Sequence, residues 1–461
     1  MRLFKVFFPT RVVALLLSEI VLIFGCYFVA AYFTTETPSF FLFEDTGLYR
    51  IGLVTACIVG GFYLSDLYSQ LRVRAKSRLL QQVCFVLGIS FLIQSLLDYL
   101  RLQDWALPKW MMIYGSAFII VIEPGWRVLY DRLVIRRLAR ETVLFLGASP
   151  VARMVAERLA EIPHFGLSVG GFLEDSPVSD GLPPNLLLGP ISHLGEVVAS
   201  MKPQRIIVGM TERRDRMPVQ SLLELRFSGI HIEDAQSAYE NVYSRVCVKD
   251  LRPSQLIFMA DLGPRAGGEF WQGVYSYIIA LIGFVVTSPL MLLVAGLIRL
   301  TSRGPALYRQ LRAGRNGANF TLLKFRSMYQ DAEAKSGAVW ASKDDPRVTP
   351  LGRWLRQLRI DELPQLINVL RGEMVIVGPR PERPEFVKVL VEQIPYYHQR
   401  LAVKPGITGW AQVNHKYGDT LEDTLLKLEY DLYYIKNLNL TLDAYIMFQT
   451  VKVMMLSRGA Q

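Results

Sequence analysis

The chain has 461 residues, of which 51% are hydrophobic, and a formal net charge of +10. This length exceeds what one hydrophobic core usually serves, and so high a hydrophobic fraction excludes an ordinary large soluble enzyme, so we expect a membrane protein of two or three domains. The sequence shows no zinc-ligand spacing and no RNA-binding signature. We therefore expect the excess of basic residues to bind anionic lipid headgroups and phosphorylated substrates. Nucleic acid is not expected as a partner. The cysteines show no disulfide or metal-binding spacing, as expected on the reducing cytoplasmic side.

Four apolar segments, at about 12–33, 50–68, 80–100 and 109–130, are long enough to cross a bilayer. Positively charged residues stay on the cytoplasmic side, which predicts four transmembrane helices with both ends in the cytoplasm. The basic residues that set this orientation are Arg2, Lys5, Arg11, Arg72, Arg74, Lys76, Arg78, Arg132, Arg136, Arg137 and Arg140. Four acidic residues lie in or beside the segments, and we favour helix packing or an interfacial position over an intramembrane function for Glu19, Asp66, Asp98 and Glu123.

After the fourth segment, strand and helix patterns alternate. The predicted strands cover 142–149, 169–175 and 205–209, with helices over 151–162 and near 193–201, as in a doubly wound Rossmann-like domain. The first turn keeps Gly147 but has Ser149 and Ala152 where a dinucleotide-binding fingerprint has its second and third glycines. We therefore expect a structural, regulatory or dimerising domain here rather than a dinucleotide site.

A strongly apolar stretch returns at about 270–300 and is interrupted by Ser288-Pro289. Proline removes a backbone donor and clashes with the preceding turn, so a helix should kink there. Two alternatives remain: the helix crosses the membrane, or it turns back at Ser288-Pro289 as a re-entrant helix. The arginine-rich segment that follows opposes translocation and favours the re-entrant form.

Two adjacent carboxylates, Asp361 and Glu362, stand just ahead of Pro364 and an apolar run with helical spacing. Proline is tolerated best in a first helical turn, so the pair should lie at a helix N-terminus. Unpaired N–H groups and the helix dipole favour anions there, including a phosphate or a metal-bridged ligand. The alternative interpretation is an acidic cap on an ordinary helix.

Four nearby stretches are richer in Arg, Lys, Gly and Pro than packing requires. They cover 301–312, 323–328, 377–382 and 404–414. Lys324 and Arg326 alternate with apolar residues, which would put both charges on one side of a strand. Prolines on either side of Arg380 would present its guanidinium from a stiff loop, as a phosphate clamp requires. Together the stretches predict an anion site.

The order of these motifs resembles that of bacterial sugar transferases, the monotopic polyprenyl-phosphate hexose-1-phosphate transferases that start exopolysaccharide and O-antigen synthesis. The motifs are Gly-Pro-Ala-Leu-Tyr-Arg-Gln at 304–310, Lys-Phe-Arg-Ser-Met at 324–328, Asp-Glu-Leu-Pro-Gln at 361–365, Gly-Pro-Arg-Pro-Glu at 378–382 and Lys-Pro-Gly-Ile-Thr-Gly-Trp at 404–410. The likeness is specific over about 265–461 and looser in front, where the chain resembles the large three-part members and, among them, the exosortase-associated subgroup.

The resemblance implies the fold: a membrane α-helical bundle (1–138), an α/β Rossmann-like domain (139–255) and a small α/β membrane-associated catalytic domain (256–461) with a re-entrant helix near 270–300. It implies a bacterial inner-membrane enzyme with its catalytic domain on the cytoplasmic side. The expected assembly is a homodimer.

The resemblance also implies a reaction in which a nucleotide diphosphate sugar, commonly a UDP-hexose, gives its sugar 1-phosphate to undecaprenyl phosphate. Asp361 corresponds to the nucleophile that forms a covalent phosphosugar intermediate, and Glu362, with Asp361, to the Mg²⁺ ligands. The residues expected to bind substrate phosphates are Lys324, Arg326, Arg356, Arg380 and Glu382.

One departure bears on the donor. Many members have Ser-Leu before the carboxylate pair, whereas this chain has Arg359-Ile360, which leaves the sugar undetermined. An alternative function is an inactive membrane scaffold whose Rossmann-like domain senses a nucleotide. A polytopic phosphoglycosyl transferase without a covalent intermediate is a third possibility, but its many-helix architecture is not seen in the sequence.

Overall fold

The computed structural model describes residues 2–3, 6–7, 10–68, 76–135, 141–162, 166–175, 183–210, 216–248, 266–330, 345–415 and 420–455. The chain divides into two compact units, one formed mainly by residues 7–148 and 156–233 and the other mainly by residues 149–155 and 234–461. Several basic residues used to predict orientation lie outside the described part: Lys5, Arg72, Arg74, Arg136, Arg137 and Arg140.

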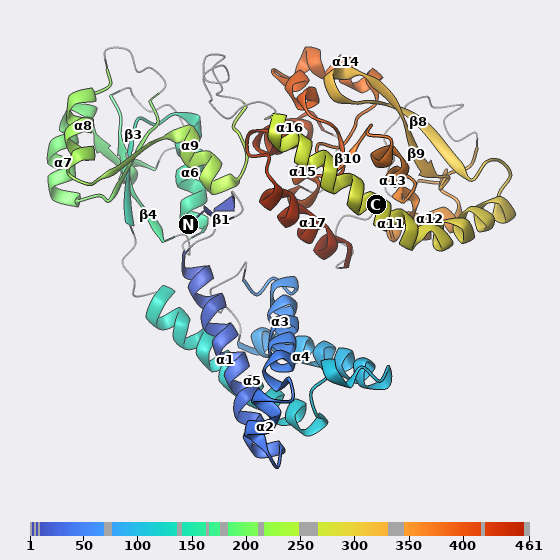
Figure 1. The fold of residues 1–461 in the computed structure, drawn as a ribbon. Helices are drawn as coiled ribbons and strands as arrows, with labels where there is room; N and C mark the ends of the chain where they lie inside the picture. Colours follow the sequence, from blue (N-terminus) through green and yellow to red (C-terminus); the bar gives the residue numbers. More distant parts are fainter. Residues whose placement is uncertain are drawn as a thin grey trace. The chain divides into compact units, whose positions relative to one another are not determined.

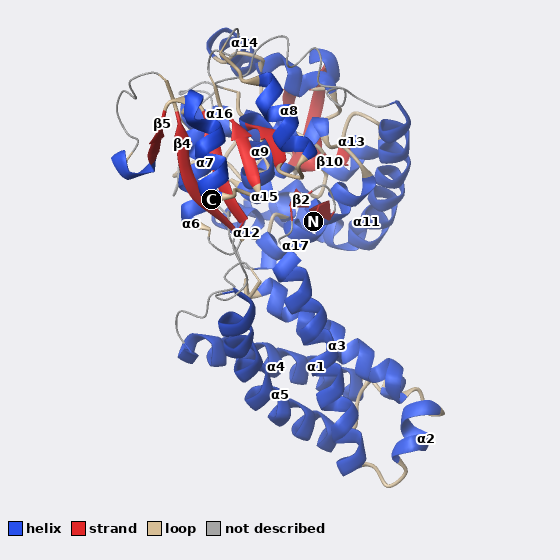
Figure 2. Cartoon of the chain, turned by 90° about the vertical axis from the view of Figure 1, so that its left-hand side faces the viewer, coloured by secondary structure: helices blue, strands red, loops and turns tan. Residues whose placement is uncertain are grey.

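Four long helices form a bundle in the first unit (Figure 1). They are α1 (Thr10–Thr34), α3 (Gly47–Leu64), α4 (Lys76–Tyr99) and α5 (Lys109–Tyr130), and each is apolar and long enough to cross a membrane, which confirms the four predicted helical segments. Figure 2 shows these four segments as helices. The short elements before, between and after these helices in the sequence are β1 (Arg2–Leu3), β2 (Val6–Phe7), α2 (Pro38–Phe43), η1 (Gln103–Trp105) and η2 (Asp131–Ile135).

Charged side chains inside the bundle pair with one another. Arg127 of α5 places its Nε 2.9 Å from Glu19 Oε1 and 2.6 Å from Glu123 Oε1. Tyr68 donates a hydrogen bond of 2.6 Å to Glu19 Oε2. Both carboxylates are fully buried. Because a buried charge is costly unless it is paired, these contacts support the predicted packing role for Glu19 and Glu123.

The α/β part of the chain contains a five-stranded sheet in the order β5-β4-β3-β6-β7. The described pairs β3–β4, β3–β6 and β4–β5 are parallel, as alternating strands and helices predict. Apolar side chains of α7 and α8, including Leu194 and Leu222, pack with Leu144 and Ile206 of the sheet. The elements are β3 (Glu141–Leu146), α6 (Pro150–Glu161), β4 (Leu167–Leu173), η4 (Pro184–Leu186), β5 (Leu187–Gly189), η5 (Ile191–His193), α7 (Leu194–Met201), β6 (Arg205–Val208), α8 (Val219–Phe227) and β7 (His231–Asp234).

The turn after β3 is closed by an acidic side chain. Gly147 has a φ of +93° and its Cα lies against the backbone of Met210, so a side chain would be strained there. The Ala148 N–H, which a dinucleotide phosphate would need, donates to Glu174 Oε2 at 2.7 Å. A carboxylate in this position repels a phosphate. The arrangement favours the predicted structural or regulatory role.

Helix α9 (Ala235–Tyr243) and the residues after it pack within the second unit on α16 (Leu421–Lys436). The Glu429 carboxylate of α16 accepts hydrogen bonds from Tyr239 Oη at 3.0 Å and from the Val248 N–H at 3.1 Å, and Arg245 Nε lies 3.2 Å from it. Lys436 Nζ pairs with Glu240 at 2.8 Å. The segment up to Val248 is therefore tied to the C-terminal part of the chain.

Helix α11 (Ala266–Thr301) covers the predicted apolar stretch at 270–300 and is a fifth helix of the described residues that could cross a membrane. Pro289 lies inside it, and the helix changes direction along its length in Figure 1. Ser288 Oγ donates to the Val285 carbonyl at 2.8 Å, a local bond that often accompanies a bend. The helix is thus continuous and bent. Its return to one membrane face stays a prediction.

The rest of the second unit surrounds two small strand pairs. The hairpin β8–β9 is antiparallel with Tyr308 opposite Lys324, and β10 pairs in parallel with β11. The later half of α11 packs on this hairpin through Met291, Ile298 and Phe325. The elements are β8 (Leu307–Ala313), η6 (Arg315–Gly317), β9 (Asn319–Phe325), α12 (Pro350–Gln357), η7 (Ile360–Glu362), α13 (Gln365–Leu370), β10 (Val375–Val377), α14 (Pro384–Gln393), η8 (Tyr397–Ala402), β11 (Gly406–Thr408), α15 (Trp410–Asn414) and α17 (Leu440–Met455).

Candidate active site

The adjacent carboxylates lie in a short 3₁₀ turn between two helices. Arg359 follows α12 and is the N-cap of η7, and it adopts the left-handed backbone conformation with a φ of +54°. Pro364 follows as the N-cap of α13, which has six residues. The prediction placed the pair at the N-terminus of this helix, and the structure places it one turn ahead. So short a helix has a small dipole, so nearby side chains must supply most of the positive charge around the pair.

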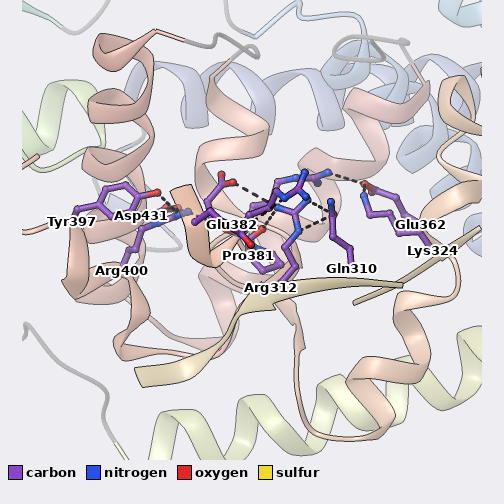
Figure 3. A network of polar contacts seen from close by, with 12 residues as sticks. Gln310, Arg312, Lys324, Glu362, Pro381, Glu382, Tyr397, Arg400 and Asp431 are labelled. Carbon is purple, nitrogen blue, oxygen red and sulfur yellow. Dashed lines mark hydrogen bonds and ion pairs between the residues drawn. The ribbon is translucent and has the colours of Figure 1, made fainter. Parts of the chain in front are cut away.

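Three cations converge on the Glu362 carboxylate. Lys324 Nζ of β9 lies 3.2 Å from Glu362 Oε1, and Arg380, from the loop after β10, places a guanidinium nitrogen 3.0 Å from the same oxygen. Arg359 lies 3.5 Å from Glu362 Oε2. Figure 3 shows the first of these contacts at one end of a line of polar side chains. The structure thus brings together Lys324, Arg380 and Glu362, three residues that the sequence predicted for the site.

The two carboxyl groups differ in their ionisation. Burial opposes the charge on Glu362, but Lys324, Arg380 and Arg359 outweigh it and hold the pKa of this carboxyl below its usual range. Burial raises the pKa of Asp361, and the negative charge of Glu362 adds to the rise, while Lys324 opposes it. Glu362 is therefore the carboxyl group of the pair that stays ionised, and Asp361 is the more basic carboxylate.

The Asp361 side chain is buried, at 8% exposure. Among the residues that the structure describes, none donates a hydrogen bond to its carboxylate or forms an ion pair with it. Cations near it, first Lys324 and then Arg356, stabilise its charged form at longer range. The oxygens of this carboxylate thus accept no hydrogen bond from the described residues, and nearby cations could neutralise a diphosphate. Such a carboxylate is suited to act as a nucleophile.

Lys324 and Arg326 do not converge on one site. Strand β9 ends at Phe325, so Arg326 leaves the sheet. Its guanidinium donates to the Ser302 carbonyl and hydroxyl, both at 2.8 Å, near the end of α11. Carbonyls at a helix C-terminus lack intrahelical partners and are stabilised by a cation. Arg326 therefore binds the end of α11, and of these two residues only Lys324 reaches the carboxylate pair.

Arg356 lies in the last turn of α12, a few residues before the carboxylate pair. Its Nε donates to Ser327 Oγ at 3.2 Å, which holds the side chain between α12 and the segment after β9. Its charge lowers the pKa of Asp361. Arg356 therefore lies near Asp361, and its role as a phosphate contact stays a prediction.

The loop that carries Arg380 is fixed from behind by a buried ion pair that the sequence did not suggest. Arg400 of η8 donates to the Arg380 carbonyl at 3.0 Å and to Asp431 of α16 at 2.9 Å and 3.1 Å. Tyr397 accepts a further bond from Arg400 at 2.8 Å. In Figure 3, Tyr397, Arg400 and Asp431 lie at one end of the line of polar side chains, and Lys324 lies at the other end. Because Arg400 and Asp431 are far apart in sequence, no spacing could have revealed them.

Glu382 contributes to a second support of the same loop. Arg312 of β8 donates to the Pro381 carbonyl at 3.0 Å and lies 3.7 Å from Glu382 Oε2 (Figure 3). Burial, followed by the charges of Arg380 and Arg383, lowers the pKa of Arg312 to about 10. Glu382 thus faces a structural arginine, and Arg312 joins the cationic surroundings of the site.

The buried pair behind Arg380 gives a prediction about stability. Asp431→Ala leaves the Arg400 charge buried without its partner, which typically costs about 3–5 kcal/mol. We expect a clear fall in the thermal unfolding midpoint of the detergent-solubilised protein, measured by scanning fluorimetry. Glu422→Ala, an exposed change on the same helix, is the control and should leave the midpoint close to that of the wild type. An unchanged midpoint with lost activity would instead place Arg400 in contact with substrate.

A metal cage made by the protein alone is not found: among the described residues, no group of three His, Cys, Asp or Glu side chains is placed to hold an ion. Mg²⁺ often uses one or two carboxylates together with substrate phosphate oxygens. Asp361 and the ionised Glu362 fit that pattern. The fit requires a bound diphosphate, because Lys324 and Arg380 already share Glu362 Oε1.

Comparison with known proteins shows the family of the chain. Residues 268–457 match the bacterial sugar transferase family. The chain is 30% identical over 422 residues, 89% of each chain, to the UDP-glucose:undecaprenyl-phosphate glucose-1-phosphate transferase of Escherichia coli (strain K12). The chain belongs to the bacterial sugar transferase family.

Two further relatives match shorter parts of the chain. The undecaprenyl-phosphate glucose phosphotransferase of Komagataeibacter xylinus is 33% identical over 76% of this chain and 66% of its own. The UDP-N-acetylgalactosamine-undecaprenyl-phosphate N-acetylgalactosaminephosphotransferase of Aeromonas hydrophila is 43% identical over 48% of this chain and 52% of its own. The match thus spans about half to two thirds of these two relatives.

Proposed function

We propose that this sugar transferase moves a sugar 1-phosphate from a nucleotide diphosphate sugar, a UDP-hexose, to undecaprenyl phosphate and so starts exopolysaccharide or O-antigen synthesis. The observation that carries the proposal is the contrast between the two adjacent carboxylates. Glu362 is bound by Lys324, Arg380 and Arg359, while the Asp361 oxygens have no hydrogen-bond donor among the described residues. The names of the relatives, which join a UDP-sugar to undecaprenyl phosphate, support the same substrates.

In the first step an Asp361 oxygen attacks the phosphorus next to the sugar. The bond from that phosphorus to the bridging oxygen breaks, and the nucleoside monophosphate leaves with the bond electrons. Lys324, Arg380 and Arg356 are placed to neutralise the charge that develops on the phosphate oxygens. The product is a phosphosugar joined to Asp361.

In the second step an oxygen of the polyprenyl phosphate attacks the same phosphorus. The bond to Asp361 breaks, and the carboxylate is restored as the polyprenyl diphosphate sugar forms. Because the intermediate is covalent, the donor and the acceptor, which differ greatly in polarity, can bind one after the other. Asp361 must be ionised to attack in the first step. Because the pKa of this carboxyl is raised, its ionised form is a stronger nucleophile.

We also propose Mg²⁺ as the cofactor, with Glu362 and Asp361 as its protein ligands. When bound, the ion would neutralise the diphosphate and stabilise the leaving group. The catalytic part would lie at the cytoplasmic face of the inner membrane, with α11 returning to that face at Ser288-Pro289. Nucleotide sugars and the phosphate of the lipid acceptor are both accessible there.

A nucleotide-release assay tests this function. The full-length protein is given undecaprenyl phosphate, Mg²⁺ and either UDP-glucose or UDP-N-acetylgalactosamine, the donors in the names of its relatives. We expect release of uridine monophosphate with one of them, dependent on the acceptor for repeated turnover. If no UDP-sugar gives release with well-folded protein, the alternative of an inactive scaffold is favoured.

A further inference from the structure

A cavity of about 150 Å³ opens beside the carboxylate pair. Its lining includes Arg359 and Glu362 of the site already described. Most of the other lining residues have aliphatic side chains, from the turn after η7 and from α13, β11, α15 and α17: Leu363, Leu366, Ile407, Val413, Val453 and Met454. The cavity thus combines two charged residues of the site with a mainly apolar lining.

Most of the polar groups in the wall are bonded within the wall. Thr408 and Thr450 share a hydrogen bond of 2.7 Å between their hydroxyls. Gln412 donates from Nε2 to the Ile407 carbonyl at 3.2 Å, and its Oε1 is the one buried side-chain oxygen of the described lining without a hydrogen-bond partner. These side chains offer little to a sugar or a nucleotide, whose many polar groups would lose their hydrogen bonds to water. The cavity is therefore unsuited to the donor.

The cavity also reaches the apolar surface of the C-terminal helix. Met454 of α17 lines it and is 47% exposed, and its neighbour Val451 is 52% exposed. Leu366 also lines the cavity and lies beside Gly283 of α11, a helix long and apolar enough to cross a membrane. An apolar path from the carboxylate pair therefore leads towards helices that expose apolar side chains, as a lipid would require.

We propose that this cavity binds the phosphate-proximal isoprene unit of the lipid acceptor, with Arg359 at its charged end holding the acceptor phosphate. A cavity of this volume holds a molecule about the size of benzene, which is close to one five-carbon isoprene unit. Later units would continue along α17 into the bilayer. The proposal rests on the proposed function, because it takes the acceptor to be a polyprenyl phosphate.

The left-handed backbone of Arg359 agrees with this role. A non-glycine residue in that conformation stores strain and often marks a functional position. The conformation places Arg359 where it both lines the cavity and lies 3.5 Å from Glu362. The residue that departs from the common Ser-Leu pattern thus stands between the apolar cavity and the carboxylate pair, and we assign it to the acceptor.

Filling the cavity separates the two half-reactions. Val453→Phe on α17 fills the apolar part of the cavity, whereas Val389→Phe makes the same change at an exposed position of α14, outside the cavity lining, and serves as the control. Nucleotide release is measured first without acceptor, as one burst per enzyme, and then at steady state against undecaprenyl phosphate. We expect Val453→Phe to keep the burst and raise the acceptor KM about tenfold or more, because an isoprene unit loses its apolar contacts. Val389→Phe should change neither.

The outcomes distinguish the two levels of the proposal. No burst with the wild type would contradict the proposed function itself. An intact burst with an unchanged acceptor KM in Val453→Phe would overturn the cavity assignment alone. If Val453→Phe fails to fold, Val413→Phe fills the same cavity from α15 and is judged in the same way. A lost burst in a folded variant would assign the cavity to the donor and also overturn the proposal.

Discussion

Asp361→Asn should lower turnover by at least about a thousandfold while leaving the protein folded. Asparagine keeps the size of the side chain but is a poor nucleophile, and loss of a covalent nucleophile usually costs several orders of magnitude. None of the described residues bonds to the Asp361 carboxylate, so the change breaks no contact that holds the fold. The measurement is the initial rate of nucleotide release with donor, acceptor and Mg²⁺.

Glu385→Gln is the matched control for this change. Glu385 is exposed on α14, where its only described ion pair is a long one to Arg383, at 3.8 Å. It should retain wild-type turnover. If Asp361→Asn kept more than about a tenth of the wild-type rate, Asp361 could not be the nucleophile.

Glu362→Gln should lower turnover by about a hundredfold and raise the Mg²⁺ concentration needed for half-maximal rate. Three cations lose their common partner, and a metal bound with the diphosphate loses its anionic protein ligand. The measurement is the rate of nucleotide release over a Mg²⁺ series at constant ionic strength. Unchanged turnover with unchanged Mg²⁺ dependence would contradict the assignment of Glu362 as metal partner.

The same substitution should change how stability depends on pH. The pKa of Glu362 is held below its ordinary value of about 4.3, so its ionised form stabilises the folded protein above that pH. This contribution is lost as the pH falls through the lower folded pKa. Below about pH 4 the wild type should therefore lose stability faster than Glu362→Gln. Parallel curves of unfolding midpoint against pH would show that the cations do not stabilise Glu362.

The local patterns of the sequence predicted most of the elements. The four apolar segments at 12–33, 50–68, 80–100 and 109–130 are helices, and the strands predicted at 142–149, 169–175 and 205–209 are β3, β4 and β6. Apolar runs of bilayer length and strand–helix alternation depend on residues close in sequence, so they can be read without tertiary structure.

The parts that the sequence could not supply are set by tertiary contacts. Lys324 and Arg326 share a motif, but the end of β9 separates them and sends Arg326 to α11. Arg400 and Asp431 meet behind Arg380 although no motif joins them. The cavity beside Glu362 is built from α13, β11, α15 and α17, which come together only in the folded chain.

The central claim is that the sugar phosphate becomes attached to Asp361. In the most direct measurement, the full-length protein is incubated with its UDP-sugar and Mg²⁺ without acceptor. The reaction is stopped in acid, and the peptides are mapped by mass spectrometry. We predict a hexose phosphate on the peptide containing Asp361, lost when undecaprenyl phosphate is added and absent from Asp361→Asn. Release of nucleotide that requires the acceptor, with no adduct on any peptide, would contradict the covalent route.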